Sequence, residues 1–94
     1  MRLVAFRKRL INTEIAGRMV QLRKRKKLSQ KSLALRSGVS LGSLKRFEQT
    51  GEISLQSLTK IAIALEVEGE LEELFSKVPF ASIDEVIHAQ TRSI

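Results

Sequence analysis

The 94-residue sequence contains no cysteine, no tryptophan and no tyrosine, and it has one histidine and one proline. The lack of cysteine excludes disulfide bonds, thiolate metal sites and thiol catalysis, so folding must depend on the burial of apolar side chains. The single histidine, His88, has no second catalytic group near it in the sequence and is interpreted as a surface residue. We therefore expect no enzymatic activity, no metal and no cofactor.

Long hydrophobic runs are also absent. Apolar residues make up 43% of the chain but are spread along it, and no run approaches the roughly 18 residues that a transmembrane helix needs. Basic residues interrupt the apolar residues among the first ten positions, unlike the pattern of a signal peptide. These features predict a cytoplasmic protein with no membrane partner, and the length favours one small domain with tails.

Charge is divided unevenly between the two halves of the chain. Residues 1–50 contain fourteen Lys or Arg against two acids, a net charge of +12, whereas residues 51–94 contain three bases against eight acids, a net charge of −5. The sum is the overall charge of +7. A basic half attracts polyanions, because each neutralised phosphate releases counterions, so DNA, RNA and anionic lipid are all candidate partners.

Apolar spacing and N-cap residues predict an all-α fold with five helices. Ser29, Ser40 and Ser54 are candidate N-caps, and Gly38 is a candidate left-handed residue at a helix end. For the first helix, Asn12 and Thr13 are both suitable caps, and cations over its last turn complement the helix dipole. The predicted helices span about residues 12–26, 29–37, 40–49, 54–65 and 70–75, the last with Leu71, Leu74 and Phe75 on one face.

Both ends of the chain are ambiguous. Apolar residues at positions 4, 6 and 10 lie among bases, as in an edge strand or a flexible arm, and both interpretations stay open for residues 1–11. The bases Arg7, Lys8 and Arg9 fit either an arm that reaches DNA or a solvated tail. Residues 77–94 form a tail in which segment 83–87 fits a strand or a helical turn. This tail is a candidate contact for a dimer or a protein partner, and the domain itself is predicted to span residues 12–76.

Two short helices joined at Gly38 form the arrangement of a helix-turn-helix unit. At about 100° per residue, Leu44 and Phe47 share one face of the second helix, while Lys45 and Arg46 fall on the other. That outer face is small, polar and cationic, and it also contains Gly42 and Gln49. Arg can bond the guanine edge with two hydrogen bonds and Gln can do the same with adenine, so Arg46 is the strongest candidate for base recognition.

The residues Leu22-Arg23, Leu28-Ser29-Gln30, Leu33-Ala34, Ser37-Gly38-Val39-Ser40, Leu44 and Phe47-Glu48 resemble the Cro/C1 (XRE) type of helix-turn-helix. The resemblance covers about residues 15–75 and implies a five-helix, lambda-repressor-like domain that binds double-stranded DNA in a sequence-specific way. It also implies that Gln30 holds a phosphate and braces the recognition helix, and that Arg23 pairs with Glu48. The positions that match base-reading residues of the family are Leu41, Gly42, Ser43, Lys45 and Arg46.

Phosphate contacts are expected mainly at helix N-termini, where free amides and the positive end of the dipole favour anions. The sequence departs from the family at Ser32, often a glutamate that would complete a capping box, and at Gly42, where relatives often place a long base-reading side chain. The predicted phosphate-binding residues are Ser29, Gln30, Lys31, Ser40, Gln49, Thr50 and Ser54.

The basic half of the chain is compatible with more than one nucleic-acid partner and more than one regulatory role. RNA is a weaker candidate than DNA because four phenylalanines, without tyrosine or tryptophan, offer no stacking platform. A homodimer on an inverted repeat with half-sites about 34 Å apart is expected, since one recognition helix rarely gives enough specificity. We therefore expect a transcriptional repressor. The alternative is an antitoxin, because the predicted helix at 54–65 and residues 76–94 resemble the small HipB-type regulators that neutralise a HipA-like kinase toxin.

Overall fold

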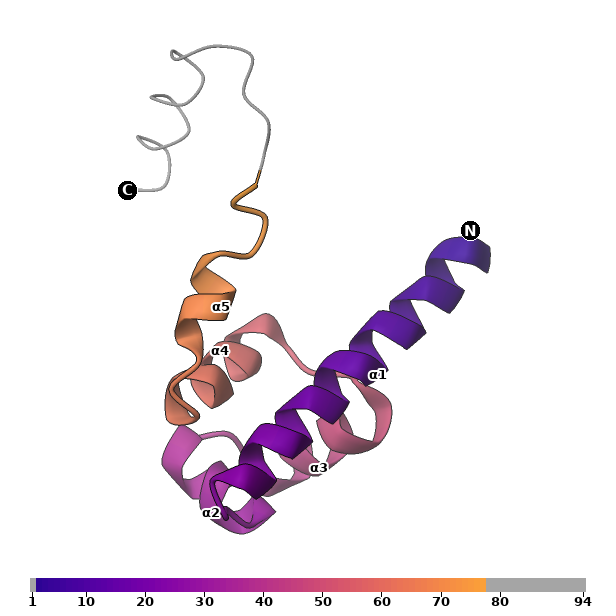
Figure 1. Ribbon diagram of the computed structural model, residues 1–94. Coiled ribbons are helices and arrows are strands. Elements are labelled where there is room, and N and C mark those ends of the chain that lie inside the picture. The colour runs from indigo at the N-terminus through magenta and orange to yellow at the C-terminus, as the bar shows by residue number, and fades with distance from the viewer. Residues whose placement is uncertain (1, 78–94) are drawn as a thin grey trace, which may run out of the picture.

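The computed structural model of the protein describes residues 2–77. Within this part of the chain every regular element is a helix, in the order α1 (Arg2–Arg25), α2 (Gln30–Ser37), α3 (Leu41–Thr50), α4 (Leu55–Ala64) and α5 (Glu68–Glu72) (Figure 1). The predicted all-α fold with five helices is confirmed. Expectations for the tail, including the segment 83–87, His88 and the antitoxin resemblance of residues 76–94, lie almost wholly outside the described residues.

Serine caps begin three of the helices as predicted. The hydroxyl oxygens of Ser29, Ser40 and Ser54 accept hydrogen bonds from the backbone N–H three residues later, at 3.0, 3.1 and 3.1 Å. Each cap satisfies one backbone donor that the first helical turn leaves unpaired. The ends of α2 and α3 are formed by Gly38 and Gly51, whose φ angles of 75° and 78° lie in the left-handed region that favours glycine.

The first helix begins ten residues earlier than expected. It runs from Arg2 without a break, so the described part of residues 1–11 is neither an edge strand nor a flexible segment, and Asn12 and Thr13 are not caps. The Thr13 hydroxyl instead donates to the Arg9 carbonyl oxygen within the helix. No glycine or proline precedes Gly17, and extending an existing helix costs much less than nucleating a new one.

The last helix is shorter and earlier than predicted. α5 covers Glu68–Glu72, and the chain has left it by Phe75, which has a φ of 61° and is 84% exposed. Leu71 is half-buried and Leu74, 53% exposed, borders the same apolar hollow, whereas the expectation that Phe75 lies on their face is wrong. Acidic side chains at the C-terminal end of a helix oppose its dipole, which explains why the acidic run does not extend α5.

The core lies where α2, α3 and α4 meet under α1. Phe47, Leu33, Leu44, Ile61 and Leu65 are its largest fully buried side chains. α1 adds two buried residues from its second half and packs mainly on α3, while its first half extends beyond the rest of the domain (Figure 1). No helix within residues 2–77 is long and apolar enough to cross a membrane.

Candidate nucleic-acid interface

The two faces of α3 are divided as the sequence predicts. Leu44 and Phe47 are 0% and 1% exposed, because they fill the core between α1, α2 and α4. Lys45 and Arg46 are exposed on the opposite face, together with Gly42, Ser43 and Gln49. The helix thus presents a polar, cationic surface to solvent while its apolar side anchors it to the domain.

Leu41 does not share this exposed surface. Although it matches a base-reading position of the family, it is half-buried and packs against the core. It lies three residues before Leu44, a spacing that places both on the same helical face. Four of the five predicted base-reading residues therefore face solvent, and Leu41 serves mainly to seat the start of α3.

A buried polar cluster holds α1, α2 and the end of α3 together. Arg23 donates from Nε and Nη2 to the two carboxylate oxygens of Glu48, at 2.9 and 3.1 Å, and from Nη1 to the Leu28 carbonyl oxygen at 3.0 Å. Gln30 adds a hydrogen bond from Nε2 to Glu48 Oε1 at 2.9 Å. The side chains of Arg23 and Glu48 are 11% and 9% exposed, so their charges are almost fully removed from water and compensated by each other. Both the predicted ion pair and the bracing contact of Gln30 are present in the structure.

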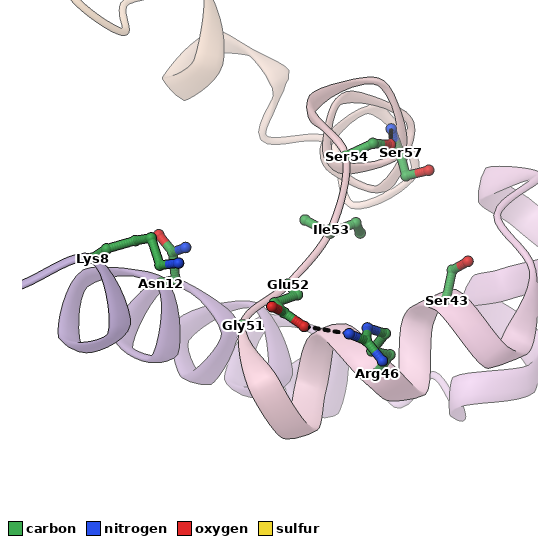
Figure 2. A pocket seen from close by; sticks show the side chains of 9 residues that line it. All are labelled: Lys8, Asn12, Ser43, Arg46, Gly51, Glu52, Ile53, Ser54 and Ser57. Atoms are coloured by element: carbon green, nitrogen blue, oxygen red, sulfur yellow. Dashed lines mark hydrogen bonds and ion pairs between the residues drawn. The ribbon is translucent and has the colours of Figure 1, made fainter. Parts of the chain in front are cut away.

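Arg46 is held at rest by a residue that the sequence did not reveal. Its Nη2 lies 2.5 Å from Glu52 Oε2, and both side chains are more than half exposed, at 67% and 57% (Figure 2). Thr50 supports the turn between them, because its hydroxyl donates to the Arg46 carbonyl oxygen at 2.7 Å and accepts from the Glu52 N–H at 3.1 Å. The strongest base-reading candidate is thus paired with a carboxylate.

A shallow surface hollow lies beside this pair. It is bordered by Lys8 and Asn12 of α1, by Ser43 and Arg46 of α3, and by the chain that leads into α4 (Figure 2). Ser54 and Ser57 of the α4 N-terminus close its far side, where backbone amides and the helix dipole favour an anion. Of the three bases expected in an N-terminal arm, Lys8 therefore lies on the same hollow as Arg46, carried there by helix rather than by a loose segment.

The predicted phosphate-binding residues are mostly exposed, but many are already hydrogen-bonded. The hydroxyl groups of Ser29 and Ser40 donate to the hydroxyl oxygens of Ser32 and Ser43, at 3.0 and 2.8 Å, while they cap their helices. A phosphate at either position would have to compete with these bonds. Gln30 is half-buried, whereas the others are on the surface; the exposed candidates are Ser29, Lys31, Ser40, Gln49, Thr50 and Ser54.

Comparison with protein families decides the identity of this arrangement. The Helix-turn-helix family matches residues 19–71, more than half of the chain, from the second half of α1 to α5. The chain belongs to this Cro/C1-type helix-turn-helix family. It is accordingly a DNA-binding transcription regulator, with double-stranded DNA as its partner. No match was found among curated proteins or among solved structures.

The helix-turn-helix match leaves two surface features unexplained. Glu52 lies inside the matched region, but its contact with Arg46 crosses the Gly51 turn at a separation of six residues, and helical spacing indicates only pairs three or four apart. Lys8 lies before the matched region, and the alternating apolar pattern around it gave no clear helical signal. Both residues border the hollow: Lys8 is among the bases that the sequence offers as a DNA contact, whereas a search for charges close to the recognition helix in sequence would have found Glu52.

Proposed function

We propose that this protein is a transcriptional repressor that places α3 in the major groove and binds an inverted-repeat operator as a homodimer. The observation that carries the proposal is the opposition between the two faces of α3, with Leu44 and Phe47 fully buried and Lys45 and Arg46 exposed. A helix held in this way can enter a groove without losing its contacts with the core. Repression is the proposed direction because occupation of an operator is sufficient to block a promoter.

Base recognition in this proposal rests on Ser43, Lys45 and Arg46. Gly42 has no heavy atom within 4 Å of the position that a Cβ would take, so it leaves open space for close approach of DNA. Arg46 must exchange its contact with Glu52 for a guanine edge. The exchange costs little, because an exposed ion pair contributes no more than about 1 kcal/mol.

Phosphate recognition is assigned to residues around the edge of the same surface. Lys31 is exposed on the first turn of α2, where the cation adds to the dipole of the helix. Lys8 and the α4 N-terminus at Ser54 border the hollow beside Arg46 and can hold the backbone of the same groove. Gln30 is already bonded to Glu48, so we expect it to orient α3 first and to contact phosphate second.

Selection of bound fragments from a random DNA pool, followed by footprinting, tests the proposal. We expect an inverted repeat whose half-sites are separated by about one helical turn, roughly 34 Å. A reporter gene that carries the selected operator should be expressed less when the protein is present. Recovery of unrelated sequences, or a footprint without two-fold symmetry, would contradict the dimeric repressor.

The contrast between Arg46→Ala and Lys31→Ala tests the division of roles. Loss of a bidentate base contact should weaken operator binding by about 1 to 3 kcal/mol and relax the preference at one base position. Loss of a phosphate contact should weaken binding to all sequences and reduce the dependence of affinity on salt. Equal losses for Arg46→Ala on operator and random DNA would argue against direct readout.

A further inference from the structure

One side of the N-terminal half of α1 is uncovered in the described part of the chain, although Lys8 and Asn12 on its other side border the hollow beside α3. The start of α1 projects beyond the other helices (Figure 1), and residues 2–11 lie before the region that matches the helix-turn-helix family. They nevertheless contain large apolar side chains, since Leu3, Phe6 and Leu10 are 69%, 64% and 48% exposed. A DNA-binding domain of this kind does not need such a projection for its own core.

Three of the five large apolar residues exposed in this segment follow the spacing of helices that pair with other helices, while Val4 and Ile11 lie on another side of α1. Leu3, Phe6, Leu10, Thr13 and Gly17 are separated by three and four residues in turn, the spacing of a coiled-coil seam. We call these five residues the outer stripe. At about 100° per residue the stripe lies on a different side of α1 from its core residues Ala16 and Met19. All five residues are exposed, and a Cβ at Gly17 would meet no heavy atom within 4 Å, so the stripe is open along its whole length.

Charge indicates what kind of surface would cover the stripe. Residues 2–11 contain four bases and no acid, an unfavourable combination at a helix N-terminus, where the dipole is also positive. The one acid in α1 is Glu14, which lies beside the stripe and whose carboxylate is 66% exposed, 3.6 Å from Arg18. A second α1 in antiparallel orientation would bring Glu14 of each copy toward Arg7 of the other copy.

We propose that the outer stripe pairs with the outer stripe of a second copy of this chain, with the two α1 helices antiparallel. In this alignment Leu10 faces Thr13 of the other copy and Phe6 faces Gly17, so a large side chain meets a small one in these two layers, while Leu3 lies opposite residue 20. Arg7 and Glu14 then form two equivalent ion pairs across the interface. A parallel alignment would instead oppose Gly17 to itself and bring Arg2 next to Arg7.

The inference rests on the proposed dimeric repressor and names the surface through which its two subunits associate. The stripe is short, so we expect it to bury less than the roughly 1,200 Å² at the lower end of standard interfaces. We therefore expect association in the micromolar range, to be strengthened when both subunits occupy one operator. Association can be measured without DNA, so its failure is distinguishable from a failure of DNA binding.

Sedimentation equilibrium of the full chain without DNA is the first test. Leu10→Asp, which places a charge in the centre of the stripe, should weaken self-association at least about tenfold. Arg7→Glu should weaken it as well, and the double variant Arg7→Glu with Glu14→Arg should restore it, because each ion pair is then reversed. Lys60→Glu is the matched control, since Lys60 is exposed on α4 and belongs to neither proposed contact surface, and it should leave association unchanged.

Disulfide trapping tests the orientation, and the absence of native cysteine makes it simple. A mixture of the Leu10→Cys and Thr13→Cys proteins should form a covalent heterodimer faster than either protein forms a homodimer. Rapid homodimer formation by Leu10→Cys alone would indicate parallel helices and overturn the proposal. Unchanged association of both Leu10→Asp and Arg7→Glu, with their circular dichroism spectra intact, would overturn it as well.

Discussion

Gly51 ends α3 and also touches α1, and replacing it with alanine separates these two roles. Its φ is 78°, and a Cβ added there would lie 2.8 Å from the carbonyl carbon of Asn12 and 3.0 Å from its Cβ and its carbonyl oxygen. These atoms belong to a packed helix and cannot rotate away. Gly38 is the natural control, because its φ of 75° is nearly the same and a Cβ there meets nothing within 4 Å.

The magnitude follows from adding the two effects. An alanine in the left-handed region costs about 1 to 2 kcal/mol, partly offset by the lower entropy of the unfolded chain, so Gly38→Ala should destabilise the domain by about 1 kcal/mol. The overlap with α1 should add about 1 to 3 kcal/mol, as overpacking does elsewhere. We therefore expect Gly51→Ala to lower the free energy of unfolding by about 2 to 4 kcal/mol.

Urea unfolding followed by circular dichroism gives both values, provided that the slope of the transition is the same in the two variants. In thermal unfolding, each kcal/mol should lower the Tm by about 4 to 8 °C for a domain of this size. The Asn12→Ala change should not rescue Gly51→Ala, because it keeps the backbone and the Cβ of residue 12. Equal destabilisation at Gly38 and Gly51 would show that the close approach of α1 is not required.

Three further changes test the buried cluster and the surface of α3. Glu48→Ala leaves Arg23 charged, buried and without its carboxylate, so the free energy of unfolding measured in urea should fall by about 3 to 5 kcal/mol; a loss below 1 kcal/mol would contradict the pair. Glu52→Gln removes the acid from Arg46, and we expect tighter binding to random DNA with less than about 1 kcal/mol change in stability, whereas weaker binding would show that Glu52 positions Arg46 productively. Gly42→Ala should stabilise the free domain by about 1 kcal/mol, and reduced operator affinity in the same protein would reveal close approach of DNA at this position.

The sequence predicts those parts of the fold whose causes are local. Ser29, Ser40 and Ser54 signal helix starts because a cap needs one side-chain oxygen and the next three residues. Gly38 signals an end because its left-handed conformation is decided by a single residue. The inward face of α3 is equally legible, because helical period alone places Leu44 and Phe47 together.

The start of α1, the end of α5 and the Arg46–Glu52 contact were harder to predict, because they depend on the absence of helix-breaking residues, on the energetics of a whole helix or on a contact across a turn. Nothing in residues 2–11 stops a helix, yet two competent caps at positions 12 and 13 suggested a start that continuous hydrogen bonding makes unnecessary. The end of α5 was missed for the opposite reason, because apolar spacing favoured a helix where the acids of its last turn oppose the dipole. In both cases a local signal was outweighed by the cost of beginning or extending the whole helix.

The ion pair between Arg46 and Glu52 is a contact that sequence spacing does not reveal, yet it determines the resting state of the principal recognition residue. A carboxylate beside the recognition face weakens attraction to every phosphate, specific or not. It can be displaced at small cost when the guanidinium finds a guanine edge, since the pair is exposed and weak in water. The repulsion from Glu52 acts on operator and random DNA alike, but only the operator offers Arg46 a bidentate contact that compensates for the lost pair. Glu52 therefore lowers the affinity for all DNA, and the operator affinity that is left depends on base recognition by Arg46.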